Sequence, residues 1–250
     1  MSRVDTALLE WIGRIGAVSA SDAQLRFGLA PPGARARLAA LRREELIVER
    51  RLLHDVPPLY VATRAGLREV GLAALGTCRV SAASFAHWRA CARVAVFLER
   101  RHPGRVSSDR ELRMIQRERG GRVASAPVGV LHGGEPGSHR PDLVVWPREP
   151  GGLPVAVEVE LTTKAPRRLQ EICRAWARAR ELGGVVYYAP APVERALARV
   201  IAALRAQESI WVVPLDVVDA ELAGPRAVAT GAKRGCERLG APGKAVSSAA

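Results

Sequence analysis

The chain has 250 residues, 48% of them apolar, so it can bury a substantial core and form one large or two small domains. Its net charge of +13 and pI near 10.9 favour a polyanionic partner. Nucleic acid is favoured over a membrane, because the sequence has no basic amphipathic helix with an aromatic face and no apolar run of about 20 residues.

Residues 1–76 have the pattern of short helices followed by a β-hairpin. Apolar residues at helical spacing predict the first helix, Ser19 or Ser21 caps the second, and a Pro-Pro-Gly run precedes the third. We expect helices over residues 5–16, 19–27 and 34–43, strands at 46–48 and 59–63, and a further helix from 64. This order predicts a winged helix-turn-helix domain.

Arginines of the third helix and the hairpin are candidates for DNA contact. In a winged helix the third helix lies in the major groove and the hairpin lies near the phosphate backbone. An ordinary solvated surface is the alternative, because arginine is common throughout this chain. The candidates are Arg35, Arg37, Arg42, Arg43, Arg50 and Arg51.

Residues 77–221 predict a second domain in which helices and strands alternate after a long amphipathic helix. Helices are expected over residues 84–101, 109–117, 166–182 and 192–206, and strands over 143–146, 155–161, 185–188 and 210–213. The alternation predicts an α/β (α+β) fold with a mixed sheet. Residues 222–250, rich in Gly, Ala, Pro, Ser and basic residues, are expected to form a disordered basic tail.

Three acids are candidates for a metal site in this second domain. Glu158 and Glu160 fall on one face of the strand over residues 155–161, and a hairpin with the preceding strand would bring Asp142 to the same side. Like charges side by side resist burial, and a divalent cation with oxygen ligands, such as Mg²⁺, removes that cost. A strand with one solvated face is the alternative.

A scarce lysine follows these acids. The chain has 35 arginines and 3 lysines, and Lys164 is the only lysine before the tail. Its compact ammonium group can approach a phosphoryl oxygen or a water as a point charge. The acids lie in residues 141–221, the only segment with a negative net charge. An acid cluster followed by lysine indicates metal-dependent phosphodiester chemistry, and a chance placement is the alternative.

These motifs resemble those of the PD-(D/E)xK nuclease superfamily, which has a restriction-endonuclease-like fold. Pro141-Asp142 is followed sixteen positions later by Glu158-x-Glu160 and then by a helix. In that superfamily the Asp and the first acid of the second motif bind Mg²⁺, and a lysine two residues on orients or activates the attacking water. Here Glu160 stands at the lysine position, and Lys164 would supply the ammonium group from a shifted one.

Over roughly residues 5–215 the chain also resembles the replication-relaxation proteins of actinobacterial plasmids and integrative elements. The resemblance rests on the expected winged helix, on the run from Ser108 to Arg113, and on the motifs around Asp142 and Glu158. It implies a DNA-binding protein for replication or relaxation of a mobile element. It also implies that Glu111 lies beside the metal site, the alternative being a solvent-exposed helix residue.

The expected reaction is Mg²⁺- or Mn²⁺-dependent hydrolysis of a phosphodiester bond in double-stranded DNA. Asp142 and Glu158 would bind the metal, Glu160 would complete the ligand set or act as a base, and Lys164 would stabilise charge on the phosphate. One site nicks one strand, so a double cut needs a homodimer. The alternative is a catalytically inactive nuclease-fold protein that regulates replication or transcription.

Further cations in the second domain are candidates for phosphate contact. Arg140 either holds the scissile phosphate or pairs with an acid, and Arg167 and Arg168 follow the acidic motif on the next helix.

The cysteines and the start of the chain indicate the compartment. The four cysteines are too scattered for a zinc knuckle or a disulfide framework and are expected to be reduced and mostly buried. The first residues lack the apolar region of a secretory signal. We therefore expect a cytoplasmic protein with no small-molecule cofactor.

Overall fold

The computed structural model describes residues 1–130 and 136–224. It divides into two compact units, Met1–Val123 and Ala124–Ala250, and its helices and mixed sheet confirm the predicted mixed α/β class. The division differs from the expected boundary after residue 76, because the helices within residues 77–123 pack against the helices at the start of the chain. From residue 225 on, the tail expected over residues 222–250 lies outside the described residues.

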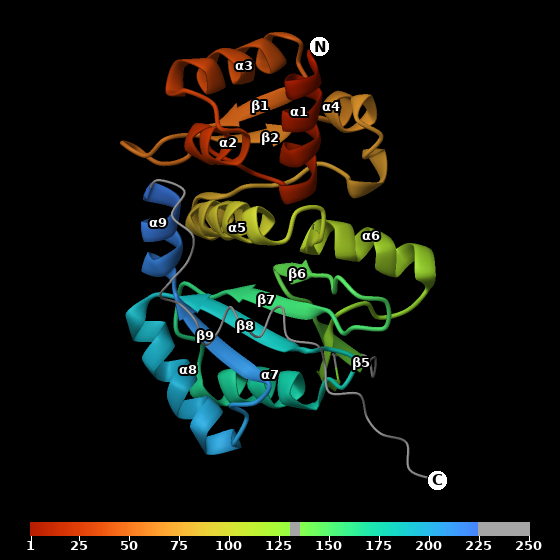
Figure 1. The fold of residues 1–250 in the computed structure, drawn as a ribbon, viewed down its shortest axis with the longest axis vertical. Coiled ribbons are helices and arrows are strands. Elements are labelled where there is room, and N and C mark those ends of the chain that lie inside the picture. The colour runs from red at the N-terminus through yellow and green to blue at the C-terminus, as the bar shows by residue number, and fades with distance from the viewer. Residues whose placement is uncertain (131–135, 225–250) are drawn as a thin grey trace. The chain divides into compact units, whose positions relative to one another are not determined.

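The first unit begins with three helices and a two-stranded antiparallel sheet (Figure 1). Its elements are α1 (Arg3–Ile15), α2 (Ala20–Phe27), α3 (Pro31–Arg43), β1 (Ile47–Arg50), β2 (Leu59–Ala62), α4 (Arg64–Glu69), η1 (Ala73–Leu75), α5 (Ala82–Arg101), β3 (Val106–Ser108) and α6 (Asp109–Arg119). Serine side chains cap several of these helices, and Ser19, one of the two expected caps, begins α2 with a capping box.

Helix α3 starts three residues earlier than expected. Pro31 and Pro32 stand in its first turn, where a missing N–H group costs nothing because no partner exists for it within the helix. The proline run therefore opens the helix and does not merely precede it.

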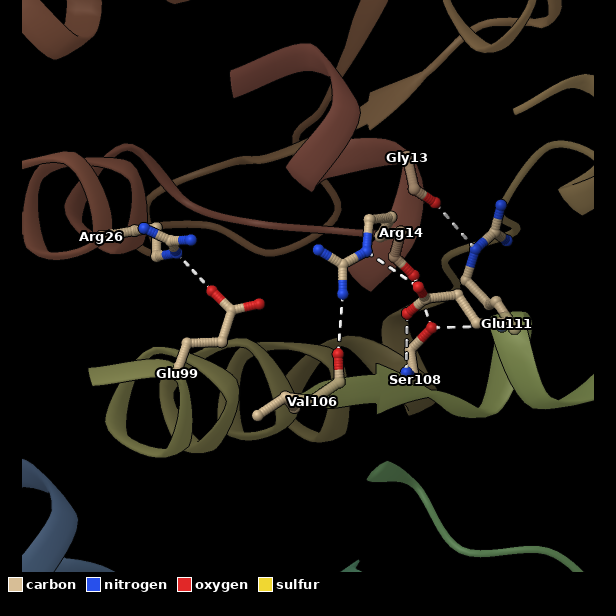
Figure 2. Close-up of polar contacts among 8 residues, drawn as sticks. Gly13, Arg14, Arg26, Glu99, Val106, Ser108 and Glu111 are labelled. Carbon is tan, nitrogen blue, oxygen red and sulfur yellow. Dashed lines mark hydrogen bonds and ion pairs between the residues drawn. The ribbon is translucent and has the colours of Figure 1, made fainter. Parts of the chain in front are cut away.

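Helices α5 and α6 are joined to α1 and α2 by polar contacts (Figure 2). The Arg14 guanidinium on α1 binds the Glu111 carboxylate at 2.8 Å and donates to the Val106 carbonyl at 2.7 Å. Arg26 on α2 pairs with Glu99 on α5, whose side chain is only 4% exposed. Apolar packing accompanies these contacts, since Phe85 of α5 belongs to a buried cluster with residues of β2. Residues 77–123 thus complete the core of the first unit.

The second unit contains a mixed sheet with helices packed against it (Figure 1). Its elements are β4 (Ala126–Val130), β5 (Pro136–His139), β6 (Leu143–Val145), β7 (Val155–Val159), α7 (Pro166–Arg178), β8 (Gly184–Ala189), α8 (Ala191–Leu204), β9 (Ile210–Pro214) and α9 (Leu215–Ala223). Strands β4 and β5 form a separate antiparallel pair. Strand β7 is antiparallel to β6 and parallel to β8, which is in turn parallel to β9.

Helix α7 holds its place through a row of buried side chains at helical spacing. Leu169, Ile172, Cys173 and Trp176 are buried, while Arg167, Arg174 and Arg178 are exposed. Each fully buried large apolar side chain contributes about 1.5–3 kcal/mol, so this row fixes α7 against its neighbours α8 and β8. No helix within the described residues is long and apolar enough to cross a bilayer.

Candidate metal centre

Strand pairing places two of the predicted acids opposite each other. Strands β6 and β7 pair with Leu143 opposite Val157, and continuing this register by one position puts Asp142 opposite Glu158. Directly opposed residues of an antiparallel pair lie on the same face. The Asp142 Oδ2 atom also accepts a hydrogen bond from the Val159 backbone N–H at 2.8 Å, which fixes the carboxylate at the end of β7.

Glu158 is the most deeply buried member of the site. Its side chain is 7% exposed, and its Oε1 atom has no hydrogen-bond partner among the described residues. The His139 Nε2 atom nevertheless lies 2.9 Å from Oε1, a distance typical of a charge-assisted contact. Burial raises the pKa of the Glu158 carboxyl and the negative charge of Asp142 adds to this, while His139 and Lys164 act in the opposite direction.

Glu160 lies two residues further on and pairs with the predicted lysine. Both Glu158 and Glu160 are buried, so the expected alternative of a strand with a solvated acidic face is wrong. The Lys164 ammonium group forms an ion pair with the Glu160 carboxylate from the loop just before α7. Burial lowers the pKa of Lys164, and the negative charges of Glu158 and Asp142 oppose that shift.

Helix α7 and strand β8 supply the surroundings of the acids. Tyr187 on β8 is paired with Glu158 in the parallel register and is buried, as is its neighbour Tyr188. Burial raises the pKa of the Tyr187 hydroxyl, and the Glu158 carboxylate raises it further. Burial also raises the pKa of the Cys173 thiol on α7 to about 11, so this cysteine is a protonated neighbour of the acids at neutral pH.

The three acids do not all converge. Among the described residues, Asp142, Glu158 and Glu160 do not bring one oxygen each to within 4.8 Å of one another. Asp142 and Glu158 face each other, whereas Glu160 is engaged by Lys164. The structure therefore supports a two-acid centre with an adjoining Glu–Lys pair.

Glu111, the additional acid implied by the family resemblance, has a structural role in the first unit. One of its oxygens accepts from the Ser108 backbone N–H at 2.8 Å, completing the capping box of α6. The other oxygen binds Arg14 at 2.8 Å, and Figure 2 shows both contacts. These contacts account for the position of Glu111 without any metal.

The arginines proposed for DNA contact in the first unit fall into two groups. Arg37 binds Asp5 at 2.7 Å, and Glu49 pairs with both Arg42 and Arg51. These three guanidinium groups are engaged within the protein. The exposed candidates outside these ion pairs are Arg35, Arg43 and Arg50.

The candidate arginines of the second unit lie near the start of α7 and beside Asp142. Arg167 and Arg168 are exposed and both lie 3.4 Å from the exposed Glu171 carboxylate, a weak interaction at that distance. Arg140 is partly buried and interacts with other described groups.

The sequence patterns missed two residues of the site: His139, which lies against Glu158, and Trp176, which packs against His139. His139 ends β5, which lies in a strand pair separate from the main sheet, and its ring packs edge-on against Trp176 with centroids 5.5 Å apart. The one available signal was the position of His139 beside the Arg140-Pro141-Asp142 run. Pairing of β5 with β4, which brings the imidazole to Glu158, is not readable from that run.

The second unit is thus an α/β domain with a facing pair of acids, the buried Glu158 and the partly buried Asp142, at the carboxyl end of β7. Comparison of the chain with protein-family models, with curated proteins and with solved structures gave no match.

Proposed function

We propose that this chain is a DNA-binding protein of the replication-relaxation type that nicks double-stranded DNA in a Mg²⁺- or Mn²⁺-dependent reaction. The observation that carries the proposal is the facing pair of Asp142 and Glu158, in which a Glu158 oxygen is buried without a hydrogen-bond partner among the described residues. Such an oxygen is costly to bury unless a cation binds it.

The residues present fit a divalent ion. Mg²⁺ is commonly held by one or two carboxylates, with water and substrate phosphate oxygens completing its shell, so Asp142 and Glu158 suffice. A bound ion would stabilise charge on the scissile phosphate and lower the pKa of a water molecule. The proposal assigns to this domain the nuclease-like fold that the sequence motifs suggest.

Glu160 and Lys164 act as a unit in this proposal. The PD-(D/E)xK pattern has a lysine at the position of Glu160, and here the Glu160 carboxylate instead holds the Lys164 ammonium group. With its side chain 35% exposed, Lys164 can approach a phosphate oxygen from the solvent side. The ammonium group thus reaches the site from Lys164, four residues after the position at which the superfamily pattern has its lysine.

The first unit would bind the DNA. Its order of three helices followed by the β1–β2 hairpin is that of a winged helix-turn-helix domain, and α2 packs against α3 as in that motif. Three exposed arginines support phosphate contact: Arg35 and Arg43 on α3, and Arg50 at the end of β1.

A second candidate function is DNA binding without cleavage, in replication or in transcriptional control. Two observations favour it: Glu160 occupies the lysine position, and the three acids do not bring their oxygens together. In that case the buried acids would be a remnant of a nuclease fold.

Relaxation of supercoiled plasmid DNA separates the two functions. The protein is incubated with plasmid and Mg²⁺ or Mn²⁺, and gel electrophoresis measures the fraction of the plasmid that becomes nicked. Asp142→Asn is the test variant, because an asparagine oxygen still accepts from the Val159 N–H. Asp216→Asn, at an exposed acid on α9, is the matched control.

We expect nicking by the unaltered protein and by Asp216→Asn, and a loss of at least about a hundredfold in Asp142→Asn. Metal-independent gel retardation of the plasmid without any nicking would contradict the nuclease proposal and favour the second function.

A further inference from the structure

His139 and Glu158 bring a ring nitrogen and a buried carboxylate oxygen close together. The Nε2 and Oε1 atoms lie 2.9 Å apart, and no hydrogen bond satisfies Oε1 in the described part of the chain. A buried carboxylate oxygen normally finds a donor, and a ring nitrogen this close would be expected to supply it.

The separation fits two ligands of one metal ion. Ligand atoms about 2.1 Å from an ion, at adjacent corners of an octahedron, lie about 3 Å from each other. We infer that His139 and Glu158 together bind a divalent transition-metal ion, with imidazole Nε2 and carboxylate Oε1 as two of its protein ligands. This inference rests on the proposed metal-dependent function and specifies which ion the centre prefers.

The surroundings hold both ligands in place. His139 is fixed by the pairing of β5 with β4, in which it lies opposite Ala126, and by the edge-on contact of its ring with Trp176. Glu158 is fixed within β7 between β6 and β8. The His139 side chain is 21% exposed, so an ion can enter from solvent on that side while the Glu158 carboxylate stays buried.

A nitrogen ligand changes the expected metal. Mg²⁺ takes oxygen ligands, whereas first-row transition ions accept imidazole nitrogen together with carboxylate oxygen. Mn²⁺ also supports phosphodiester hydrolysis, so it satisfies both the ligand set and the proposed reaction. We therefore expect the centre to bind Mn²⁺ more tightly than Mg²⁺.

Electron paramagnetic resonance of Mn²⁺ bound to the full chain, without DNA, tests this ligation directly. Electron spin-echo modulation reports a ¹⁴N nucleus bonded to the ion, and titration of the free Mn²⁺ signal gives the affinity. The test variants are His139→Phe, which keeps an aromatic ring against Trp176, and His139→Gln. His54→Gln, at a side chain that is 95% exposed in the first unit, is the matched control.

The unaltered chain and His54→Gln should bind one Mn²⁺ with ¹⁴N modulation. His139→Phe should lose the modulation and bind Mn²⁺ at least about tenfold more weakly. His139→Gln should also lose the modulation, with circular dichroism confirming that both variants are folded. Absence of ¹⁴N modulation in the unaltered chain, or its persistence in folded His139→Phe, overturns the inference. Because no DNA is present, this result is independent of whether the protein nicks plasmid.

Discussion

Glu158 places an acidic group at a position where a charge is costly. Its carboxylate is buried, Asp142 lies opposite it, and both effects raise its pKa. Groups held in this way at functional sites lower stability in return for activity. The cost should therefore be measurable in the protein without metal.

We expect Glu158→Gln to increase the free energy of unfolding by about 1 kcal/mol at pH 8 in the presence of a chelator. The amide keeps the shape of the side chain and removes its charge. Urea denaturation measures the change, and Glu171→Gln, at an exposed carboxylate on α7, should shift stability by less than about 0.5 kcal/mol. A Glu158→Gln protein less stable than the Glu171→Gln control would show that the buried charge is not a cost.

Arg43 and Arg37 provide a matched pair on helix α3. Arg43 is the last residue of α3 and is exposed, whereas Arg37 binds Asp5 in the first turn of α1. We expect Arg43→Ala to reduce the salt dependence of double-stranded DNA binding by about one unit in the slope of log K against log salt. Arg37→Ala should leave the slope nearly unchanged and lower the melting temperature. Equal slopes for Arg43→Ala and the unaltered protein would exclude phosphate contact by Arg43.

At the scale of elements, the C-cap of α5 links stability to pH. His102 is mostly buried, and its Nδ1 atom accepts from the Arg105 guanidinium at 3.0 Å, because arginine only donates. Burial lowers the pKa of His102 to about 4, and the charges of Arg105 and Arg101 add to this. The unfolded chain, with an ordinary histidine pKa near 6.5, therefore binds the proton more tightly than the folded protein.

Stability should accordingly fall as the pH decreases from about 6.5 towards 4. We expect the unaltered protein to lose about 1 kcal/mol more than His102→Gln between pH 7.5 and 5.5, since glutamine does not titrate. Urea denaturation at the two pH values measures this difference. If the unaltered protein and His102→Gln lose the same free energy of unfolding, His102 binds its proton as tightly in the folded protein as in the unfolded chain, which contradicts the prediction.

Most elements were predictable from the sequence, including the short strands β1, β2 and β6, whereas β3, β5 and α9 were not. Apolar spacing located helices α1, α5, α7 and α8 and the buried strands β7 to β9. Strands β3 and β5 lack the run of apolar residues that marked the other short strands, since β3 is Val-Ser-Ser and β5 is Pro-Gly-Ser-His. Helix α9 was missed because it follows Pro214 directly and borders the Gly- and Ala-rich tail.

The candidate site was also predictable only in part. Alternation along one strand predicted that Glu158 and Glu160 share a face, and the β6–β7 pairing brought Asp142 opposite Glu158 as a hairpin requires. The engagement of Glu160 by Lys164 and the contact of His139 with Glu158 depend on side-chain direction and on a separate strand pair. Neither follows from the spacing of residues along the chain.

At the scale of the whole molecule, residues 1–123 form one compact unit, and we expect them to fold together more stably than residues 1–76 alone. Without residues 77–123, the cluster that contains Leu59 and Val61 would lose Phe85, and Arg14 on α1 would lose its partners Val106 and Glu111. Exposed apolar side chains and unpaired charges both lower stability.

We expect a fragment of residues 1–123 to unfold cooperatively in urea. A fragment of residues 1–76 should show a broad transition at lower denaturant, with fast amide hydrogen exchange in α1. Circular dichroism and exchange measurements on the two fragments test this expectation. Equal midpoints and slopes for the two fragments would contradict the assignment of α5 and α6 to the first unit's core.

The most direct test of whether the second unit contains a metal site is anomalous X-ray scattering from crystals of the full chain soaked in Mn²⁺. The account predicts a difference peak at the Mn absorption edge within about 2.3 Å of a Glu158 oxygen and next to His139, and its loss in Glu158→Gln crystals. A map with no peak beside Glu158, under conditions in which Mn²⁺ occupies other sites on the protein, would contradict the account.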